Sequence, residues 1–190
     1  MGKRIISNKK GFTLVEIAIV MVIIGLLIGG ILKGREMIRN AKAKRIVKMA
    51  DSLRAAWNGF YDRYGVYPGD ENKPNIPEGD RHNGNGNGHI DGNEVYYVFE
   101  DLQKAGFISG EYNGTSDLPT SPFGGHVSII YANLNRTGYK HWIRFEDIPW
   151  DIAQQIDMKY DDGIYNKGSI MASSRYSASV GTIRYFYIAL

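Results

Sequence analysis

The longest apolar stretch of the chain runs from Phe12 to Leu32 and contains one charged residue, Glu16. As a helix rising about 1.5 Å per residue, this stretch extends roughly 30 Å, which is the thickness of the hydrocarbon core of a bilayer. A cleavable secretory signal has a shorter apolar region that ends at a site of small residues. No such site is evident here. The pattern therefore predicts a membrane-spanning helix.

Beyond Leu32 the chain continues without proline or a polar break, and apolar residues recur at helical spacing. This pattern predicts a single helix from Phe12 to about Arg63 whose second half is amphipathic. We expect residues 12–33 to form the transmembrane and assembly half and residues 34–64 to pack against a soluble domain. The apolar positions of the second half are Ile38, Ala41, Ile46, Met49, Leu53, Trp57, Phe60 and Tyr64.

Residues 65–190 have the patterns of one small globular domain. Residues 94–105 predict a short helix stopped by Gly106, and Pro149 is predicted to be the first residue of a helix that runs to about Asp157. Segments rich in β-branched and aromatic residues predict three strands, at residues 126–133, 139–145 and 182–188. We therefore predict an α+β fold in which a small antiparallel sheet packs on the long helix.

Charge and composition limit the partners of the chain. The net charge is +3, but Lys3, Arg4, Lys9 and Lys10 lie in the first eleven residues, where there is no acid. Without these four, basic and acidic residues nearly balance, so we predict no specific nucleic-acid partner. The absence of cysteine excludes disulfides and thiolate metal sites.

Motifs of common enzyme classes are also missing. The sequence contains no HExxH, GxSxG or Walker A pattern, and its four histidines do not have the spacing of zinc ligands. Aromatic runs near the C-terminus have the period of strand residues, which favours a core role over a stacking surface. We predict that the chain is not an enzyme.

The start of the apolar stretch, Lys9-Lys10-Gly11-Phe12-Thr13-Leu14-Val15-Glu16, resembles the prepilin peptidase signature of type IV pilins and type II secretion pseudopilins. The resemblance implies a pilin-like fold, a leader at residues 1–11, cleavage after Gly11 and N-methylation of Phe12. It also implies that Glu16 faces the Phe12 amine of a neighbouring subunit. Since a buried carboxylate and a buried ammonium each need the other, such a pair would set the axial register. The alternative is a protonated or interface-seeking Glu near the end of a span.

Further expectations follow from the same resemblance. The precursor would sit in the bacterial inner membrane through residues 12–32, and prepilin peptidase, a platform protein and a secretin would be its partners. After self-assembly the chain would lie in a helical filament, either an extracellular pilus or a periplasmic pseudopilus. Many major pilins have a helix-kinking proline where this chain has Lys33, so its rank as a major or minor subunit stays open.

Three functions are consistent with these features. The first is a structural subunit of a type IV pilus-like filament. The second is a pseudopilin of a type II secretion system that drives exoprotein export. The third is a membrane-anchored calcium-binding adhesion module that does not polymerise.

A long loop dense in Gly, Asn, Asp and Pro follows the predicted helix. From Asn83 onward, oxygen-bearing side chains fall at EF-hand positions 1, 3, 5, 9 and 12, and Gly88 occupies the sharp turn. With so few charges the site is expected to be weak and suited to millimolar calcium. The alternative is a low-complexity Asn-Gly loop with an accidental register. The predicted calcium ligands in residues 80–94 are Asn83, Asn85, Asn87, the His89 carbonyl, Asp91, Glu94 and, as an extra ligand, Asp80.

A second acidic segment follows the predicted helix at Pro149. Asp157, Asp161 and Asp162 are candidate ligands of a second cation, and a solvated acidic turn is the alternative.

Overall fold

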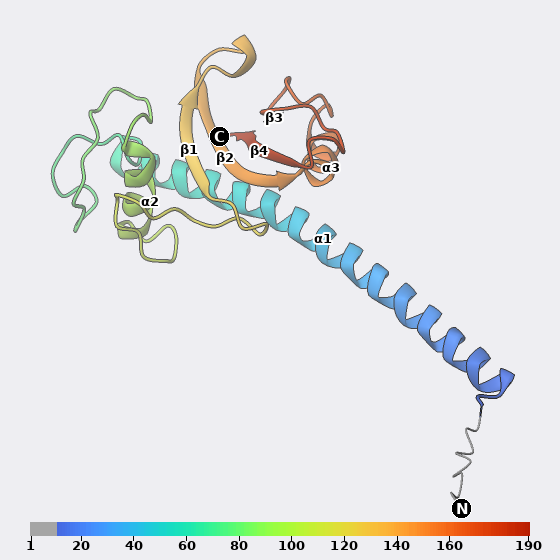
Figure 1. The fold of residues 1–190 in the computed structure, drawn as a ribbon. Helices are drawn as coiled ribbons and strands as arrows, with labels where there is room; N and C mark the ends of the chain where they lie inside the picture. The colour runs from blue at the N-terminus through green and yellow to red at the C-terminus, as the bar shows by residue number, and fades with distance from the viewer. Residues whose placement is uncertain (1–10) are drawn as a thin grey trace, which may run out of the picture. The chain divides into compact units, whose positions relative to one another are not determined.

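The computed structural model describes residues 11–190, so Gly11 is the one described residue of the predicted leader at residues 1–11. Lys3, Arg4, Lys9 and Lys10 lie outside the described residues. The chain forms two compact units, residues 1–39 and residues 40–190. The elements in chain order are α1 (Leu14–Tyr64), α2 (Glu94–Lys104), β1 (Val127–Ala132), the short 3-10 helix η1 (Leu134–Arg136), β2 (Lys140–Pro149), α3 (Trp150–Tyr160), β3 (Ile170–Ala172) and β4 (Thr182–Ala189) (Figure 1).

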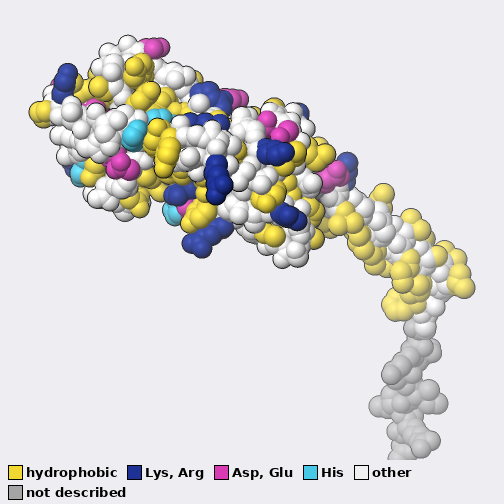
Figure 2. All heavy atoms as spheres, turned by 90° about the horizontal axis from the view of Figure 1, so that it is seen from above, with side chains coloured by type: hydrophobic (Ala, Val, Ile, Leu, Met, Phe, Trp, Pro, Cys, Tyr) yellow, Lys and Arg dark blue, Asp and Glu magenta, His cyan; other side chains and the backbone are white. Residues whose placement is uncertain are grey.

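The described part of the first unit consists of the start of α1 and the residues just before it. The predicted long helix is confirmed, since α1 is one uninterrupted helix of 51 residues. Large apolar side chains line its first half and are exposed to solvent, as for Leu14 at 86% and Leu26 at 78% exposure. Figure 2 shows these apolar side chains in yellow on the exposed helix. Among residues 11–190, no apolar surface covers this half of α1.

The second unit has a hydrophobic core that begins on α1 at Ala43. The predicted amphipathic face is confirmed from Ile46 onward, whereas Ile38 and Ala41 are exposed, because the packed stripe begins only at Ala43. α2, α3 and the sheet supply the rest of this core. The buried residues of α1 are Ala43, Ile46, Ala50, Leu53, Ala56, Trp57 and Phe60.

The sheet contains four antiparallel strands in the order β1-β2-β4-β3. The three predicted strands are confirmed, and buried cross-strand neighbours such as Phe145 and Phe186 place their side chains in the core. β3 was not predicted, because three residues are too few to show a period. The prediction for Pro149 is wrong by one position. Its ψ of 135° is extended, so it ends β2 and α3 begins at Trp150.

The connection between α1 and α2 positions the candidate site. Residues 65–93 contain no helix or strand, yet much of this segment packs closely. A Cβ atom at Gly84 would lie 2.5 Å from Asp70 Cα, and Gly84 N donates a 2.6 Å hydrogen bond to the Glu71 carbonyl. The Asn-Gly repeat therefore lies directly against the turn at residues 69–71.

Candidate functional sites

At the start of α1, Thr13 and Glu16 bond to each other. Glu16 Oε2 accepts hydrogen bonds from the Thr13 backbone N–H and the Thr13 hydroxyl, both at 2.8 Å, and the Glu16 N–H donates to Thr13 Oγ1 at 3.2 Å. This reciprocal arrangement is a capping box, which satisfies backbone donors at a helix N-terminus. The carboxylate predicted to act in assembly thus also closes the first turn of the helix.

The residues around this turn are fully accessible. Gly11, Phe12 and Thr13 are exposed and precede the helix in an irregular conformation. The first half of α1 is long and apolar enough to cross a membrane, and it is the one such candidate among residues 11–190. The Gly11-Phe12 bond therefore lies exposed beside the start of an apolar helix.

Within the predicted calcium loop, asparagine side chains accept hydrogen bonds from the backbone of the loop itself. Asn85 Oδ1 accepts from the Asn87 N–H at 3.0 Å, and Asn87 Oδ1 accepts from the His89 N–H at 2.7 Å. The His89 ring stacks on Tyr131 with centroids 4.0 Å apart. Asp91 Oδ2 lies 3.4 Å from the Asn87 amide nitrogen. The EF-hand register stays a prediction, because these local contacts do not distinguish it from a tightly folded Asn-Gly loop.

Two buried carboxylates anchor this loop from outside the repeat. Glu94, the first residue of α2, accepts from the N–H groups of Asn85 and Asp91, each at 3.0 Å. Burial raises the pKa of Glu94, while these two hydrogen bonds lower it. Asp70 accepts from the N–H groups of Asn87 and Gly88 at 2.9 and 2.7 Å. The loop conformation is therefore fixed by acids on both of its sides.

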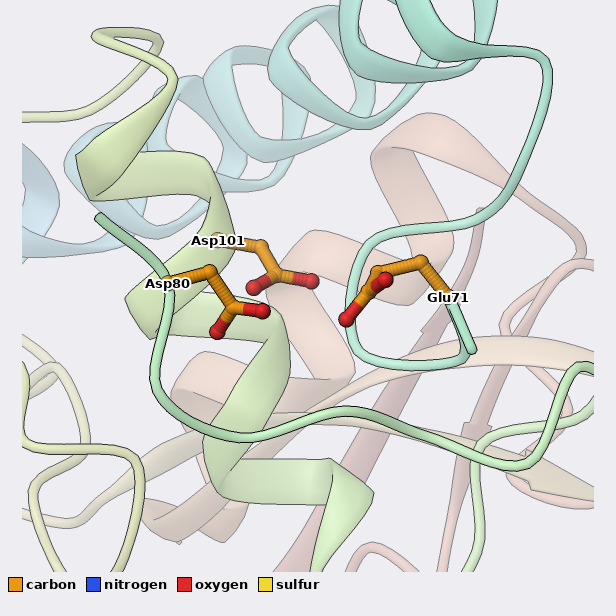
Figure 3. A group of neighbouring side chains, drawn as sticks. All are labelled: Glu71, Asp80 and Asp101. Atoms are coloured by element: carbon orange, nitrogen blue, oxygen red, sulfur yellow. The ribbon is translucent and has the colours of Figure 1, made fainter. Parts of the chain in front are cut away.

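Three carboxyl groups, two from the connection between α1 and α2 and one from α2, lie close together. Glu71, Asp80 and Asp101 each contribute one oxygen atom within 4.8 Å of the other two, and all three side chains point into the same space (Figure 3). Asp101 is 0% exposed and Glu71 is 1% exposed, while Asp80 is intermediate. We refer to these three residues as the acidic centre.

The acidic centre is short of positive partners. Asp101 Oδ2 accepts from the Gly69 N–H at 2.6 Å, but Asp101 Oδ1 is buried with no hydrogen-bond partner among the described residues. Glu71 Oε2 accepts from the Lys73 N–H at 3.0 Å, and Asp80 Oδ1 accepts from the His82 N–H at 2.9 Å. No Lys or Arg within residues 11–190 forms an ion pair with any of these three acids.

Asn83 completes the arrangement. One terminal atom of its side-chain amide lies 3.1 Å from Asp80 Oδ2 and 3.0 Å from Glu71 Oε1. If this atom is the amide nitrogen, its NH₂ group donates to both carboxylates. If it is the amide oxygen, that oxygen and the carboxylate oxygens of Asp80 and Glu71 converge on one point. The two orientations of an amide have nearly the same shape.

Burial and mutual repulsion raise the pKa values of Asp101 and Glu71 in the acidic centre. Two carboxylates about 4.8 Å apart repel each other by roughly 3 kcal/mol at an effective dielectric constant of about 20. Burial, followed by the negative charges of Asp80 and Glu71, raises the pKa of Asp101 to about 9. Burial, with smaller contributions from Asp80 and Asp70, raises the pKa of Glu71 to about 7. Either bound protons or a cation must therefore stabilise the acidic centre.

The second predicted cation group has a different character. Asp157, Asp161 and Asp162 also lie within 4.8 Å of one another. Asp157 accepts from the Tyr176 hydroxyl at 2.7 Å and the Gly163 N–H at 3.1 Å, and its burial raises its pKa. Asp161 and Asp162 accept from backbone N–H groups, including that of Ser169 at 2.6 Å. Through these hydrogen bonds the three acids stabilise the segment between α3 and β3. The second cation site stays a prediction.

The structure brings together residues that the sequence analysis treated separately. Asp80 and Asn83 were predicted ligands, but Glu71 and Asp101 were missed. The available signal was in α2, where Glu100 and Asp101 stand between Phe99 and Leu102, at positions that are buried in the helix. Acids on the apolar face of a helix are unusual and indicate a partner.

Comparison with known proteins supports the assignment of the N-terminal segment. The family model described as the prokaryotic N-terminal methylation motif matches residues 6–32. No curated protein and no solved structure matches the chain. The matched residues include Gly11, Phe12 and Glu16 and extend to the end of the apolar stretch. The chain therefore carries the prokaryotic N-terminal methylation motif, in agreement with its resemblance to type IV pilins and pseudopilins at residues 9–16.

Proposed function

We propose that this protein is a structural subunit of a type IV pilus-like filament, processed by prepilin peptidase between Gly11 and Phe12. The observation that supports this most is the position of the methylation motif at the start of an apolar helix that the described residues leave exposed. Such a helix needs an apolar environment, first lipid and then the helices of neighbouring subunits.

The composition of the helix suits the second environment. Helices in a lipid environment associate by close packing rather than by release of water, and glycines four residues apart favour that packing. Gly25 and Gly29 have this spacing, as do Gly30 and Gly34. A Cβ atom added at any of them would meet no described atom within 4 Å beyond its chain neighbours and the nearby backbone of its own helix. These glycines are thus free to receive a neighbouring helix.

Glu16 would set the axial register of the assembled helices. The two hydrogen bonds from Thr13 both reach Oε2. After cleavage the Phe12 nitrogen becomes an amine, and the Glu16 carboxylate of an adjacent subunit would neutralise it. In a bundle that excludes water, an uncompensated amine or carboxylate is strongly unfavourable, so only the register that pairs them is retained.

A pseudopilin of a type II secretion system is the second candidate. The methylation motif is common to both functions, and the unbroken α1 with Lys33 in place of a kinking proline is the feature that favours a subunit other than a major pilin. A platform protein and a secretin would be partners in either case. Imaging of sheared surface filaments for this chain separates the two, since a pseudopilin would stay within the envelope.

Processing is the direct test of the proposed function. We would replace Gly11 by Leu, and compare the variant with the wild type and with Thr13→Ser, which keeps a hydroxyl at the helix cap. Mass spectrometry of the wild-type chain should find a terminus at methylated Phe12, and Gly11→Leu should retain residues 1–11. Filaments should form from wild-type and Thr13→Ser chains and not from Gly11→Leu. Release of filaments from the uncleaved chain would contradict the proposed need for processing. A processed wild-type chain that stays in the membrane and forms no filaments would contradict the filament itself and support a non-polymerising anchor.

A further inference from the structure

The most unusual feature outside the N-terminal helix is the concentration of buried acids around α2. Five acidic side chains are buried in this region, and the one basic side chain paired with any of them among the described residues is His82, whose Nδ1 lies 2.6 Å from Glu100 Oε2. Buried carboxylates normally have paired cations or coordinate a metal. The five residues are Asp70, Glu71, Glu94, Glu100 and Asp101.

These acids are not equivalent. Asp70 and Glu94 direct both carboxylate oxygens to backbone N–H groups, and Glu100 bonds to His82. At the acidic centre the donors are too few, because Asp101 Oδ1 has none and the Asn83 amide reaches oxygens of both Glu71 and Asp80. With the carbonyl rather than the NH₂ group of Asn83 turned inward, its oxygen joins those of Glu71 and Asp80 with no hydrogen between them, which is the arrangement that a bound cation requires.

We propose that Glu71, Asp80, Asp101 and the side-chain carbonyl of Asn83 bind one calcium ion. All four donors are oxygens, which hard cations prefer over nitrogen or sulfur ligands. Oxygens no more than 4.8 Å apart fit around a single ion about 2.4 Å from each, a distance typical of calcium. The ligands come from irregular segments and one helix, and calcium tolerates such irregular geometry better than magnesium.

The ion would add a common ligand to segments that lie far apart in the sequence. Glu71 belongs to the turn after α1, Asp80 and Asn83 to the loop, and Asp101 to α2 (Figure 3). Asp80 is the most exposed carboxylate, so it lies on the side from which the ion enters. Bound calcium would therefore fasten residues 65–93 to α2. This role is independent of filament assembly and differs from the EF-hand register, which uses neither Glu71 nor Asp101.

The experiment uses the full chain in detergent micelles, freed of metal with chelator and then titrated with calcium chloride in a calorimeter. Asp101→Asn removes a carboxyl ligand from the acidic centre alone, and Asp91→Asn removes one from the EF-hand register alone. Exposed Asp62 on α1 supplies the matched control, Asp62→Asn. We expect the wild type, Asp91→Asn and Asp62→Asn to bind calcium alike, and Asp101→Asn to bind at least tenfold more weakly.

Thermal unfolding of the same proteins gives a second readout. The difference in unfolding temperature between Asp101→Asn and the wild type should change sign when calcium is added. In chelator, Asp101→Asn should unfold at a higher temperature than the wild type, because a buried acid is unfavourable without a cation, and the neutral amide can donate to a neighbouring carboxylate. In calcium, the order should reverse. Glu71→Gln should show the same reversal, which keeps the test valid if one variant fails to fold.

Several results would overturn the calcium centre. One is the absence of binding heat for the wild type at millimolar calcium. Another is loss of binding in Asp91→Asn with retention in Asp101→Asn, which would place the ion in the EF-hand register. Equal affinity for magnesium chloride would reject calcium as the ligand.

Discussion

Gly84 approaches Asp70 so closely that no larger residue fits at position 84. A Cβ atom added there would lie 2.5 Å from Asp70 Cα and also strike the Gly69 carbonyl oxygen. This contact holds the Asn-Gly repeat against the turn that carries Glu71, and it explains why a glycine is needed there for packing rather than for a positive φ.

Gly84→Ala should therefore destabilise the domain by about 2 to 3 kcal/mol, as expected when a methyl group is forced into a packed site. Gly88→Ala is the matched control, because Gly88 has a φ of +82° and open space around its Cβ position. That substitution should cost about 1 to 2 kcal/mol through backbone strain alone. Urea unfolding of the full chain in micelles, followed by tryptophan fluorescence, measures both. An equal or smaller loss for Gly84→Ala would mean that the loop relaxes away from the turn.

The pair formed by His82 and Glu100 should be a second point of attachment. Glu100 is 1% exposed, and His82 Nδ1 lies 2.6 Å from its Oε2. His82→Ala removes the partner of a buried carboxylate and should lower stability by about 1 to 3 kcal/mol. His126→Ala, at an exposed histidine, should change stability little.

A double-mutant cycle with Glu100→Gln isolates the interaction of this pair. Glu100→Gln should reduce the effect of His82→Ala, because the neutral amide is less unfavourable than an unpaired carboxylate. Independent effects of the two substitutions would show that the contact contributes nothing of its own.

The fold was more predictable than the acidic centre for a physical reason. α1 follows from an apolar run and a helical period, both of which are local, and β1, β2 and β4 follow from β-branched and aromatic residues. β3 has too few residues for a pattern. Glu71 and Asp101 meet only because the connection between α1 and α2 folds back on itself, and that path depends on contacts such as Gly84 with Asp70. The Thr13 and Glu16 pair was readable as a capping motif, but Glu16 was interpreted as an assembly residue or as a protonated or interface-seeking side chain.

His141 should make the domain sensitive to acid. Its ring lies between Trp57, Tyr67 and Tyr131, and its Nε2 has no hydrogen-bond partner among the described residues. Burial, with a smaller contribution from His89, lowers the pKa of His141 to about 4. A base with a lowered folded pKa binds protons more readily when unfolded. The neutral His141 ring therefore contributes fully to the free energy of unfolding above about pH 6.5, and this contribution is lost as the pH falls toward 4.

We expect His141→Gln to remove this dependence. The difference in unfolding free energy between the wild type and the variant should change by about 2 to 3 kcal/mol between pH 7.5 and pH 4, to the disadvantage of the wild type. The exposed His126→Gln provides the control. A difference that stays constant over this range would mean that His141 titrates normally in the folded state.

Glu16 allows the two roles of its side chain to be separated. Glu16→Gln keeps an oxygen that can accept from the Thr13 N–H and hydroxyl, so it preserves the capping box while removing the charge. Glu16→Ala removes both the hydrogen-bond acceptor and the charge, and Thr13→Ala removes the hydroxyl from the capping box and leaves the charge.

If the Glu16 carboxylate pairs with the Phe12 amine of a neighbour, Glu16→Gln and Glu16→Ala should both fail to form filaments. Thr13→Ala should form them with a helix start weakened by about 1 kcal/mol. All three should still insert in the membrane and be cleaved, as measured by mass spectrometry of the membrane fraction. Normal filaments from Glu16→Gln would instead assign Glu16 to the helix cap and leave the register to the packing of the apolar side chains.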